Sequence, residues 1–486
     1  MPEVPLAACR SAACGGVLGD PGTRVAGANA TTPREVDPFM MARTRRQKPA
    51  AWGPGVSDMS IAATSGIRSK RRRTAAVLAA SVLLLAACGD DSSDDEGSSP
   101  DKSTEESPEI LGEANPAEGT PVRVGFVTAE GGSAADLPQT RESAEAAVAY
   151  ANDYLGGLAG HEIELVTCED RSDGASGTAC ANQFVEQGVV AVVAGQVADE
   201  GLYMPALEAA GIPWVISSPT GGKALGSPTA FGISGGFIGG LGAMAALAQE
   251  EDMDSAVFFG IDVPAFTAGM SSLGGPAFEK AGVALEVIPI APGTPDATPQ
   301  VTAALGDDPD MIVVVAEQTL CKALLPAIHN LADEDTTLIM GDPCTDASVL
   351  ETVGNDAVEG AIIYNASASL GDDDAGQLYR AVLEKYAPDT NPQGKTGVGY
   401  IATLALVHAV NQVNPTGELT AAVISDALKA AKDVPVPGWP EGTFTCDRTA
   451  FAGAPALCST NALFGTVHDG VLTDFQVRNG AEFLGG

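Results

Sequence analysis

Short runs rich in Val, Ile and Phe alternate with longer segments rich in Ala from about residue 121 to the C-terminus. The short runs predict β-strands that are buried on both faces, and the longer segments predict helices. In the first half the predicted strands are VRVGFV (122–127), EIELVTCED (162–170), VVAVVAG (189–195), PWVISSP (213–219) and AFGISG (230–235), with helices near 140–155, 177–187 and 201–210. In the second half they are SAVFFGID (255–262), ALEVIPI (284–290), MIVVVAE (311–317), TLIMGD (337–342) and GAIIYNA (360–366).

Regular alternation of strands and helices indicates parallel sheets, because parallel strands need a helical crossover between them. The 366 residues from 121 to 486 are enough for two domains. We therefore expect an α/β fold with two doubly wound parallel-sheet lobes. In such sheets, ligands bind beyond the carboxyl ends of the strands.

A different pattern precedes this part of the chain. Residues 74–87 are almost wholly Ala, Val and Leu, and they follow a basic cluster at 68–73. About 14 apolar residues are too few to span a bilayer but fit the core of a signal peptide. The segment LAAC (85–88) resembles the bacterial lipobox, which implies that Cys88 carries diacylglycerol and becomes the first residue of the mature protein. The alternative is a secretory signal with a cysteine there by chance.

The position of this signal bears on where translation starts. Secretory signals begin near an N-terminus, so we expect the start at Met59, or at Met40 or Met41. Residues 1–58 would then be an upstream extension that the natural product lacks, and residues 59–87 would be the signal peptide.

Residues 88–120 are mostly Asp, Glu, Ser, Pro and Gly, a composition that cannot bury enough apolar surface to fold. We expect a disordered tether with a reach of about 30 Å. Through the lipid on Cys88 it would hold the body at the outer face of the cell membrane. From Cys88 onward the chain carries 14 of the 26 Lys and Arg and 58 of the 63 Asp and Glu, a net charge of −44. This excludes nucleic acid as a general partner, because phosphate binding needs a basic patch.

Six cysteines remain once Cys9, Cys14 and Cys88 are set aside. They form three close pairs, Cys168 with Cys180, Cys321 with Cys344, and Cys446 with Cys458. Exported proteins meet an oxidising environment, so disulfides are expected. Of the 15 possible connectivities we favour the local pairs because of their proximity. A metal site is the rival interpretation, but the chain has no CxxC and only four isolated histidines, so we expect neither metal nor cofactor.

One family resemblance covers most of the folded part. The stretch VGFVTAEGGSAADLPQTRESAEAAVAYANDYLGGLAGHEIELVTCED (124–170) resembles the opening of periplasmic binding proteins of the branched-chain amino-acid type. The likeness continues in order through ANQFVEQGVVAVVAG (181–195), MPALEAAGIPWVISSPTG (204–221) and GIDVPAFTAGMSSLGGPAFEKAGV (260–283), and extends to about Val413.

The resemblance implies a type I periplasmic binding fold with three crossovers between its lobes. One lobe would comprise residues 121–234 and 367–437, and the other residues 235–366 and 438–486. Such a protein is a monomer that closes on a small polar ligand, an amino acid, an amide or a related solute, and delivers it to an ABC permease. The mature lipoprotein on its acidic tether would stay beside that transporter.

The resemblance also implies where the ligand binds. The candidate ligand-binding residues are Glu130, Gly132, Ser133, Gln196, Asp199, Ser217, Ser218, Thr220, Phe266, Glu317, Gln318 and Asp342. Hydroxyls and backbone N–H groups of 217–220 would hold an α-carboxylate without an arginine. Asp342 would hold the ammonium group, although the family's acid commonly stands one residue later, and Phe266 replaces a frequent Tyr. The alternative for each polar residue is that it only caps a helix.

The chain departs from the family after VVAG (192–195). Where the family has a Ser-rich loop that binds carboxylate, this chain has Gln196-Val197-Ala198-Asp199-Glu200. Buried acids would repel a ligand carboxylate. Either Asp199 and Glu200 point to solvent, or the ligand is cationic or amide-like.

Two other functions stay open. Residues 232–236 satisfy G-x-S-x-G, so a serine hydrolase using Ser234 with His408 or His468 is possible in principle, although about 0.4 such matches arise by chance. A surface sensor that presents its ligand to a receptor would use the same fold as a transport protein. Gly394-Lys395-Thr396 lacks the earlier glycine of a phosphate-binding loop, so nucleotide hydrolysis finds no support. We expect a binding protein and no enzyme.

Overall fold

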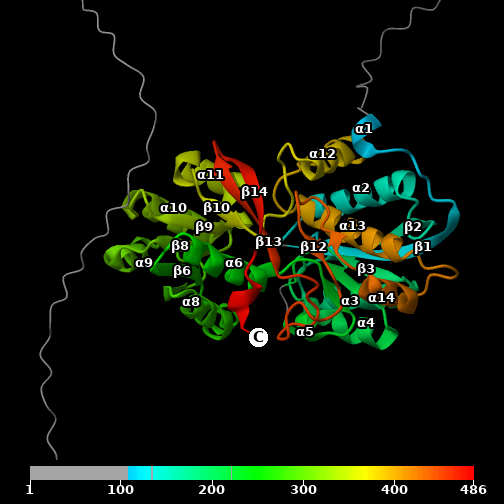
Figure 1. The fold of residues 1–486 in the computed structure, drawn as a ribbon, viewed down its shortest axis with the longest axis horizontal. Coiled ribbons are helices and arrows are strands. Elements are labelled where there is room, and N and C mark those ends of the chain that lie inside the picture. Colours follow the sequence, from blue (N-terminus) through cyan, green and yellow to red (C-terminus); the bar gives the residue numbers. More distant parts are fainter. Residues whose placement is uncertain (1–107, 133–134, 220–221, 486) are drawn as a thin grey trace, which may run out of the picture. The chain divides into compact units, whose positions relative to one another are not determined.

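The computed structural model describes residues 108–132, 135–219 and 222–485. The signal-peptide region, Cys88 and most of the tether lie outside these residues, as do Ser133 and Thr220 of the candidate site. The described part contains two α/β lobes, each built on its own sheet (Figure 1). This architecture confirms the fold class that the sequence predicts.

Five parallel strands form the sheet of the first lobe, in the order β2-β1-β3-β4-β5. They are β1 (Gly119–Ala129), β2 (His161–Asp170), β3 (Ala191–Ala194), β4 (Trp214–Ile216) and β5 (Ala230–Gly232). One face is covered by α2 (Pro138–Tyr154), α12 (Asp374–Tyr386), α13 (Thr396–Val413) and α14 (Ala421–Ala430), and the other by α3 (Gly174–Glu186) and α4 (Met204–Ala210). Alternation along β1 explains both cores, because Phe126 joins the first and Val127 the second.

Seven strands form the sheet of the second lobe, in the order β14-β13-β10-β9-β8-β6-β7. They are β6 (Ser255–Ile261), β7 (Ala284–Ile290), β8 (Met311–Val315), β9 (Thr337–Gly341), β10 (Ile362–Tyr364), β13 (Asn461–His468) and β14 (Val471–Asn479). The main helices are α6 (Gly236–Glu250), α7 (Pro264–Gly269) and α8 (Gly275–Ala281) with one core, and α9 (Thr298–Ala304), α10 (Gln318–Leu331) and α11 (Ala347–Val353) with the other. Alternate β6 residues again divide between the two cores, with Phe258 in one and Phe259 in the other.

The chain passes between the lobes three times, after β5, after β10 and before β13. The three crossing segments are hydrogen-bonded to one another. The Gly235 amide donates to the Asn461 carbonyl at 2.8 Å, and the Asn365 side-chain amide donates to the Gly236 carbonyl at 2.8 Å. The crossings therefore form one connected hinge.

Residues 438–458 lie on the first lobe, whereas the sequence analysis assigned them to the second. Arg448 donates to the carbonyls of Ser227 and Pro228, and its guanidinium lies 4.6 Å from the centre of the Phe231 ring. Backbone bonds from Gly232 to residues 456 and 458 place this segment along β5. The physical reason is that it covers an edge strand whose backbone groups would otherwise be unpaired.

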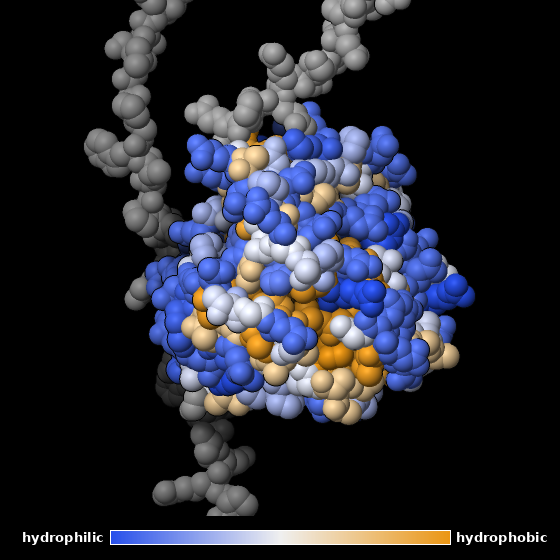
Figure 2. Space-filling view, turned by 90° about the vertical axis from the view of Figure 1, so that its right-hand side faces the viewer, coloured by the Kyte–Doolittle hydropathy of each residue, from blue (hydrophilic) through white to orange (hydrophobic). Residues whose placement is uncertain are grey.

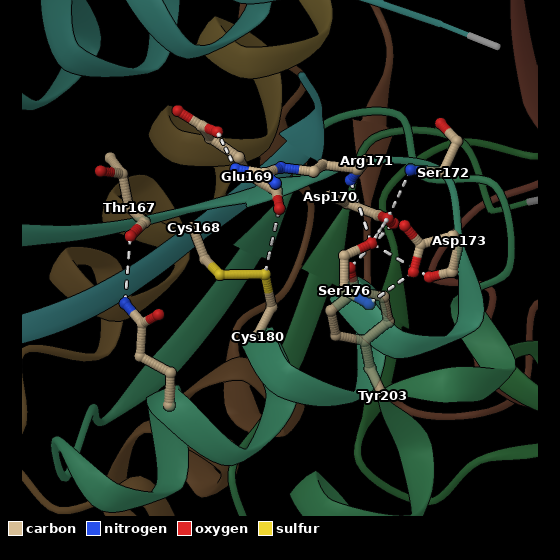
Figure 3. Close-up of a disulfide and its surroundings, with 11 residues drawn as sticks. Thr167, Cys168, Glu169, Asp170, Arg171, Ser172, Asp173, Ser176, Cys180 and Tyr203 are labelled. Carbon is tan, nitrogen blue, oxygen red and sulfur yellow. Dashed lines mark hydrogen bonds and ion pairs between the residues drawn. A yellow bond between two sulfur atoms is a disulfide. The ribbon is translucent and has the colours of Figure 1, made fainter. Parts of the chain in front are cut away.

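The three predicted disulfides are all present: Cys168–Cys180, Cys321–Cys344 and Cys446–Cys458. The first joins β2 to α3, beside a buried acid at the end of β2 (Figure 3). That acid, Asp170, accepts hydrogen bonds from the Tyr203 hydroxyl at 2.9 Å and from the Ser176 hydroxyl at 3.2 Å. Burial, followed by the charge of Asp170, raises the pKa of Tyr203. This end of β2 is thus a structural anchor.

Close packing of α13 on α2 provides a test of the first lobe. A Cβ at Gly399 would lie 2.0 Å from the Thr140 carbonyl oxygen and 2.7 Å from the Ser143 hydroxyl. We expect Gly399→Ala to lower the free energy of unfolding by about 1–3 kcal/mol, because these helices must move apart. Denaturant unfolding measures it. Gly306→Ala is the control, since its Cβ meets nothing within 4 Å; equal effects of the two changes would contradict this packing.

Candidate ligand-binding site

Polar residues follow the carboxyl ends of three neighbouring strands in the first lobe. Glu130 follows β1, Gln196 lies two residues beyond β3, and Ser217 follows β4. The Ala129 amide donates to the Gln196 carbonyl at 2.6 Å, so the first two strand ends are directly linked. The side chain of Gln196 is exposed, whereas Ser217 is buried.

Glu130 is held by a partner that the sequence analysis did not single out. Arg141, in the first turn of α2, donates from Nε and Nη2 to the Glu130 carboxylate at 2.9–3.2 Å. Its Nη1 donates to Glu145 at 2.9 Å. The hydrogen bonds to Glu130 are the main cause that raises the pKa of Arg141. The Glu130 carboxylate is thus already paired with a cation inside the protein, and only 14% of its side chain is exposed.

The loop after Glu130 approaches the protein's own backbone. Gly131 has a φ of +70°, a conformation that favours glycine. A Cβ at Gly132 would lie 2.4 Å from the carbonyl oxygen of Arg171, the residue after β2 (Figure 3). The glycine therefore permits contact with the neighbouring loop. Its predicted contact with a ligand stays a prediction.

The serines after β4 are tied to the first crossing. The Ser217 carbonyl accepts hydrogen bonds from the Ser234 hydroxyl at 2.7 Å and the Ser234 amide at 2.8 Å. Ser218 is partly exposed, and its Oγ would lie 3.2 Å from a Cβ at Gly236. The segment therefore stands directly beside the hinge.

Asp199 and Glu200 stand in the loop after β3. Asp199 is exposed, and its carboxylate accepts the Gly201 amide at 2.8 Å as the cap of a short 3-10 helix, Glu200–Leu202. Glu200 is buried, with 1% of its surface exposed. Asp199 thus performs the capping role that the sequence analysis gave as its alternative.

In the second lobe, Asp342 follows β9 and has partners from two other segments. Its Oδ2 accepts the Ser367 hydroxyl at 2.9 Å and the Lys395 ammonium at 3.3 Å. Ser367 lies at the second crossing, and Lys395 directly precedes α13 of the first lobe. Burial and the nearby Asp342 charge raise the pKa of Tyr364, at the end of β10. Asp342 is therefore the candidate residue at which the two lobes meet.

The three remaining candidates follow β6 and β8 of the second lobe. Phe266 is 6% exposed, and its ring lies across the end of β6, where a Cβ at Gly260 would come within 2.1 Å of it. Glu317 and Gln318 are exposed, and the Glu317 carboxylate caps α10 by accepting the Thr319 and Leu320 amides. Among the described residues, the side-chain partners of Asp342 are Ser367 and Lys395, and none of these three is hydrogen-bonded to it.

A separate pocket of about 580 Å³ opens at the amino ends of the first lobe's strands. It is lined by Thr120, Pro121, Val122, Arg123, His161, Glu164, Gly188, Val190, Gly417, Glu418 and Leu419. Figure 2 views this lobe from its outer side and shows apolar surface gathered in the lower half of the face. In parallel α/β sheets, ligands bind at the carboxyl ends, so this pocket is not the expected site.

The family follows from a comparison with known proteins. A family model described as periplasmic binding protein matches residues 121–456. The chain belongs to this family. It is accordingly a solute-binding protein with the type I two-lobe fold, as the sequence predicts. No curated protein matches the chain.

Solved structures similar to this chain include proteins named for different ligands. The isoleucine complex of the branched-chain amino acid transporter substrate-binding protein LivJ from Streptococcus pneumoniae is 19% identical, covers 74% of this chain and 100% of its own, and has a TM-score of 0.58. The leucine-binding protein LivK from Thermotoga maritima is 18% identical, with coverages of 74% and 99% and a TM-score of 0.56. A fatty acid ABC transporter substrate-binding protein from Thermomonospora curvata is 15% identical, with coverages of 76% and 94% and a TM-score of 0.57. At these identities the likeness shows the fold alone.

None of the helices placed in the structure is both long and apolar enough to cross a bilayer. Within the described residues, no group of three or more His, Cys, Asp or Glu is placed to hold a metal ion.

The Glu130–Arg141 pair gives a test of the first lobe's part of the site. We expect Arg141→Gln to lower the free energy of unfolding by about 1–2 kcal/mol, because a mostly buried carboxylate loses a two-point partner. Arg123→Gln is the matched control, since its pair with Glu164 is half exposed on both sides and is expected to contribute less than about 0.5 kcal/mol. Urea unfolding of both variants checks this; an Arg141→Gln cost no larger than that of the control would show that Glu130 does not need its partner.

Proposed function

We propose that this protein captures a small polar solute between its lobes, outside the cytoplasm, and delivers it to an ABC permease. The observation that supports this most is the meeting of polar side chains from both lobes beside the hinge, with Asp342 and Lys395 in contact. A ligand bound at such a place touches both lobes and so favours their closure, provided that it binds more tightly in the closed state.

The solute is proposed to be an amino acid, an amide or a related small molecule. The strand ends supply hydroxyls, backbone N–H groups and acids, which suit a polar ligand of this size. Similar structures are named for branched-chain amino acids and for a fatty acid, so the fold by itself does not select one class.

A hydrolase that uses Ser234 has less support. The Ser234 hydroxyl donates to the Ser217 carbonyl, and the residue is 5% exposed. Of its suggested partners, His468 lies between Glu359 and Asp474 at the β13–β14 turn. These contacts favour a structural role for Ser234 in the first crossing.

The attachment to the membrane is also a proposal. Cys88, directly after the signal peptide, would carry the lipid, and residues 88–107 would tether a monomeric body near the permease. Residues 108–120, which the sequence places in the tether, belong to the body instead, because Leu111 of α1 (Pro108–Leu111) is buried in the core of the first lobe and β1 begins at Gly119. The acidic, serine-rich composition of residues 88–107 supports this, because a segment with so few apolar residues cannot bury enough surface to fold.

A ligand panel tests the binding function. The chain should unfold at a higher temperature with one class among branched-chain, acidic and basic amino acids, amides, urea and polyamines. At 100 times its dissociation constant, a ligand stabilises the fold by about 2.7 kcal/mol. If the ligand that shifts the unfolding temperature is also taken up into membrane vesicles, and uptake requires the cognate permease, the protein functions in transport. Binding without any uptake indicates a sensor, and the absence of any shift across a widened panel would argue against solute capture.

Expression of a chain that starts at Met59 tests the anchor. We expect export, recovery in the membrane fraction, and a mass on Cys88 that corresponds to diacylglycerol. Cys88→Ala should release the body from the membrane, because the acyl chains supply the binding energy. A product that requires Met1, or a Cys88→Ala chain that stays in the membrane, would contradict the proposed processing.

A further inference from the structure

The acid expected to receive a ligand's ammonium group is already paired inside the protein. Only 8% of the Asp342 side chain is exposed, and its Oδ2 accepts from both Ser367 and Lys395. A solute ammonium would therefore have to displace Lys395, or approach a carboxylate whose charge is already balanced.

Lys395 is placed by the framework of the first lobe. Its carbonyl accepts the hydroxyl of Thr140 at 3.1 Å, and Thr140 is completely buried in α2. The next residue, Thr396, begins α13, and its carbonyl accepts the Ser143 hydroxyl at 2.5 Å. The lysine side chain thus extends from fixed backbone toward the other lobe.

The Lys395 ammonium has capacity for a second partner. It carries three N–H donors, and among the residues that the structure describes its hydrogen bond goes to Asp342 alone. About a third of its side chain is exposed, 30% against 8% for Asp342. Arg141 differs, because its guanidinium is bound on both edges by Glu130 and Glu145. Of these two cations, Lys395 is therefore the one whose N–H donors remain available to a solute.

We propose that Lys395 makes this site selective for a carboxylate solute that lacks an α-ammonium group. The inference rests on the proposed solute-binding function and names its ligand class. A solute carboxylate gains a charge-assisted hydrogen bond from the ammonium donors that Asp342 leaves unused. A zwitterionic amino acid instead brings a second cation beside Lys395, and like charges in a partly buried site repel each other.

Leucine and its α-keto acid form a suitable probe pair, because they share a carbon skeleton and differ only in the α-substituent. Calorimetric titration of the exported chain should show the keto acid binding at least about tenfold more tightly than leucine. The same measurement is made with isoleucine, valine and their keto acids, with short monocarboxylates, and with the rest of the ligand panel.

Variants then assign the preference to the lysine. Lys395→Met should weaken keto acid binding by about tenfold or more and narrow or reverse the preference over leucine, because Asp342 is released. Lys395→Arg keeps the charge and should keep the preference. Lys432→Met is the matched control, because Lys432 also pairs with an acid. That acid, Asp447, lies on the segment that covers β5 and not at the candidate site. The change should leave the affinities for the keto acid and for leucine unchanged.

Each outcome decides the matter. Tighter binding of an amino acid, an amine or an uncharged solute by the wild-type chain overturns the inference and leaves solute capture intact. A keto acid preference that survives Lys395→Met also overturns it. If no solute of the panel binds, the proposed function fails and the inference falls with it. The wild-type comparison needs no variant, so it can overturn the inference even if Lys395→Met fails to fold.

Discussion

The hydrogen-bonded bundle of three crossing segments is the constraint on which the arrangement of the lobes depends. Gly235 is bonded to Asn461, and Asn365 is bonded to Gly236, so no crossing can shift without the others. The lobes can therefore rotate about this bundle but cannot slide apart. Rotation of that kind separates or joins the groups beside the hinge, and the Asp342–Lys395 contact shows one such pair joined.

Most of the fold was accessible from the sequence because the central parallel strands of both sheets are continuous apolar runs. VGFV (124–127) and MIVV (311–314) are buried on both faces, so their composition alone indicates strands. The antiparallel β13–β14 hairpin was not predicted. Side chains of β14 are exposed or only partly buried along its length, as in an edge strand, and the Pro/Gly-rich segment before it obscures the pattern.

The candidate site was only partly accessible, since local sequence shows where strands end but not what meets there. Asp342 was found from its place after a strand, but its partner Lys395 is 53 residues away. Glu317 and Asp199 also follow strands, yet both cap helices, because a carboxylate at a strand end satisfies backbone amides as readily as it binds a solute. The net charge that the site presents to a ligand depends on pairs of residues far apart in the sequence, so it could not be predicted from the sequence.

The backbone of the hinge has a consequence for how such a protein can evolve. Asn365 and Gly236 both have left-handed φ angles, 53° and 54°, at two of the crossings. Few side chains adopt this conformation without strain, and glycine and asparagine are the main ones that do. Substitutions at the strand ends can accumulate and change what is bound, whereas these two positions admit almost no variation. Ligand preference can therefore change while these two hinge positions stay the same.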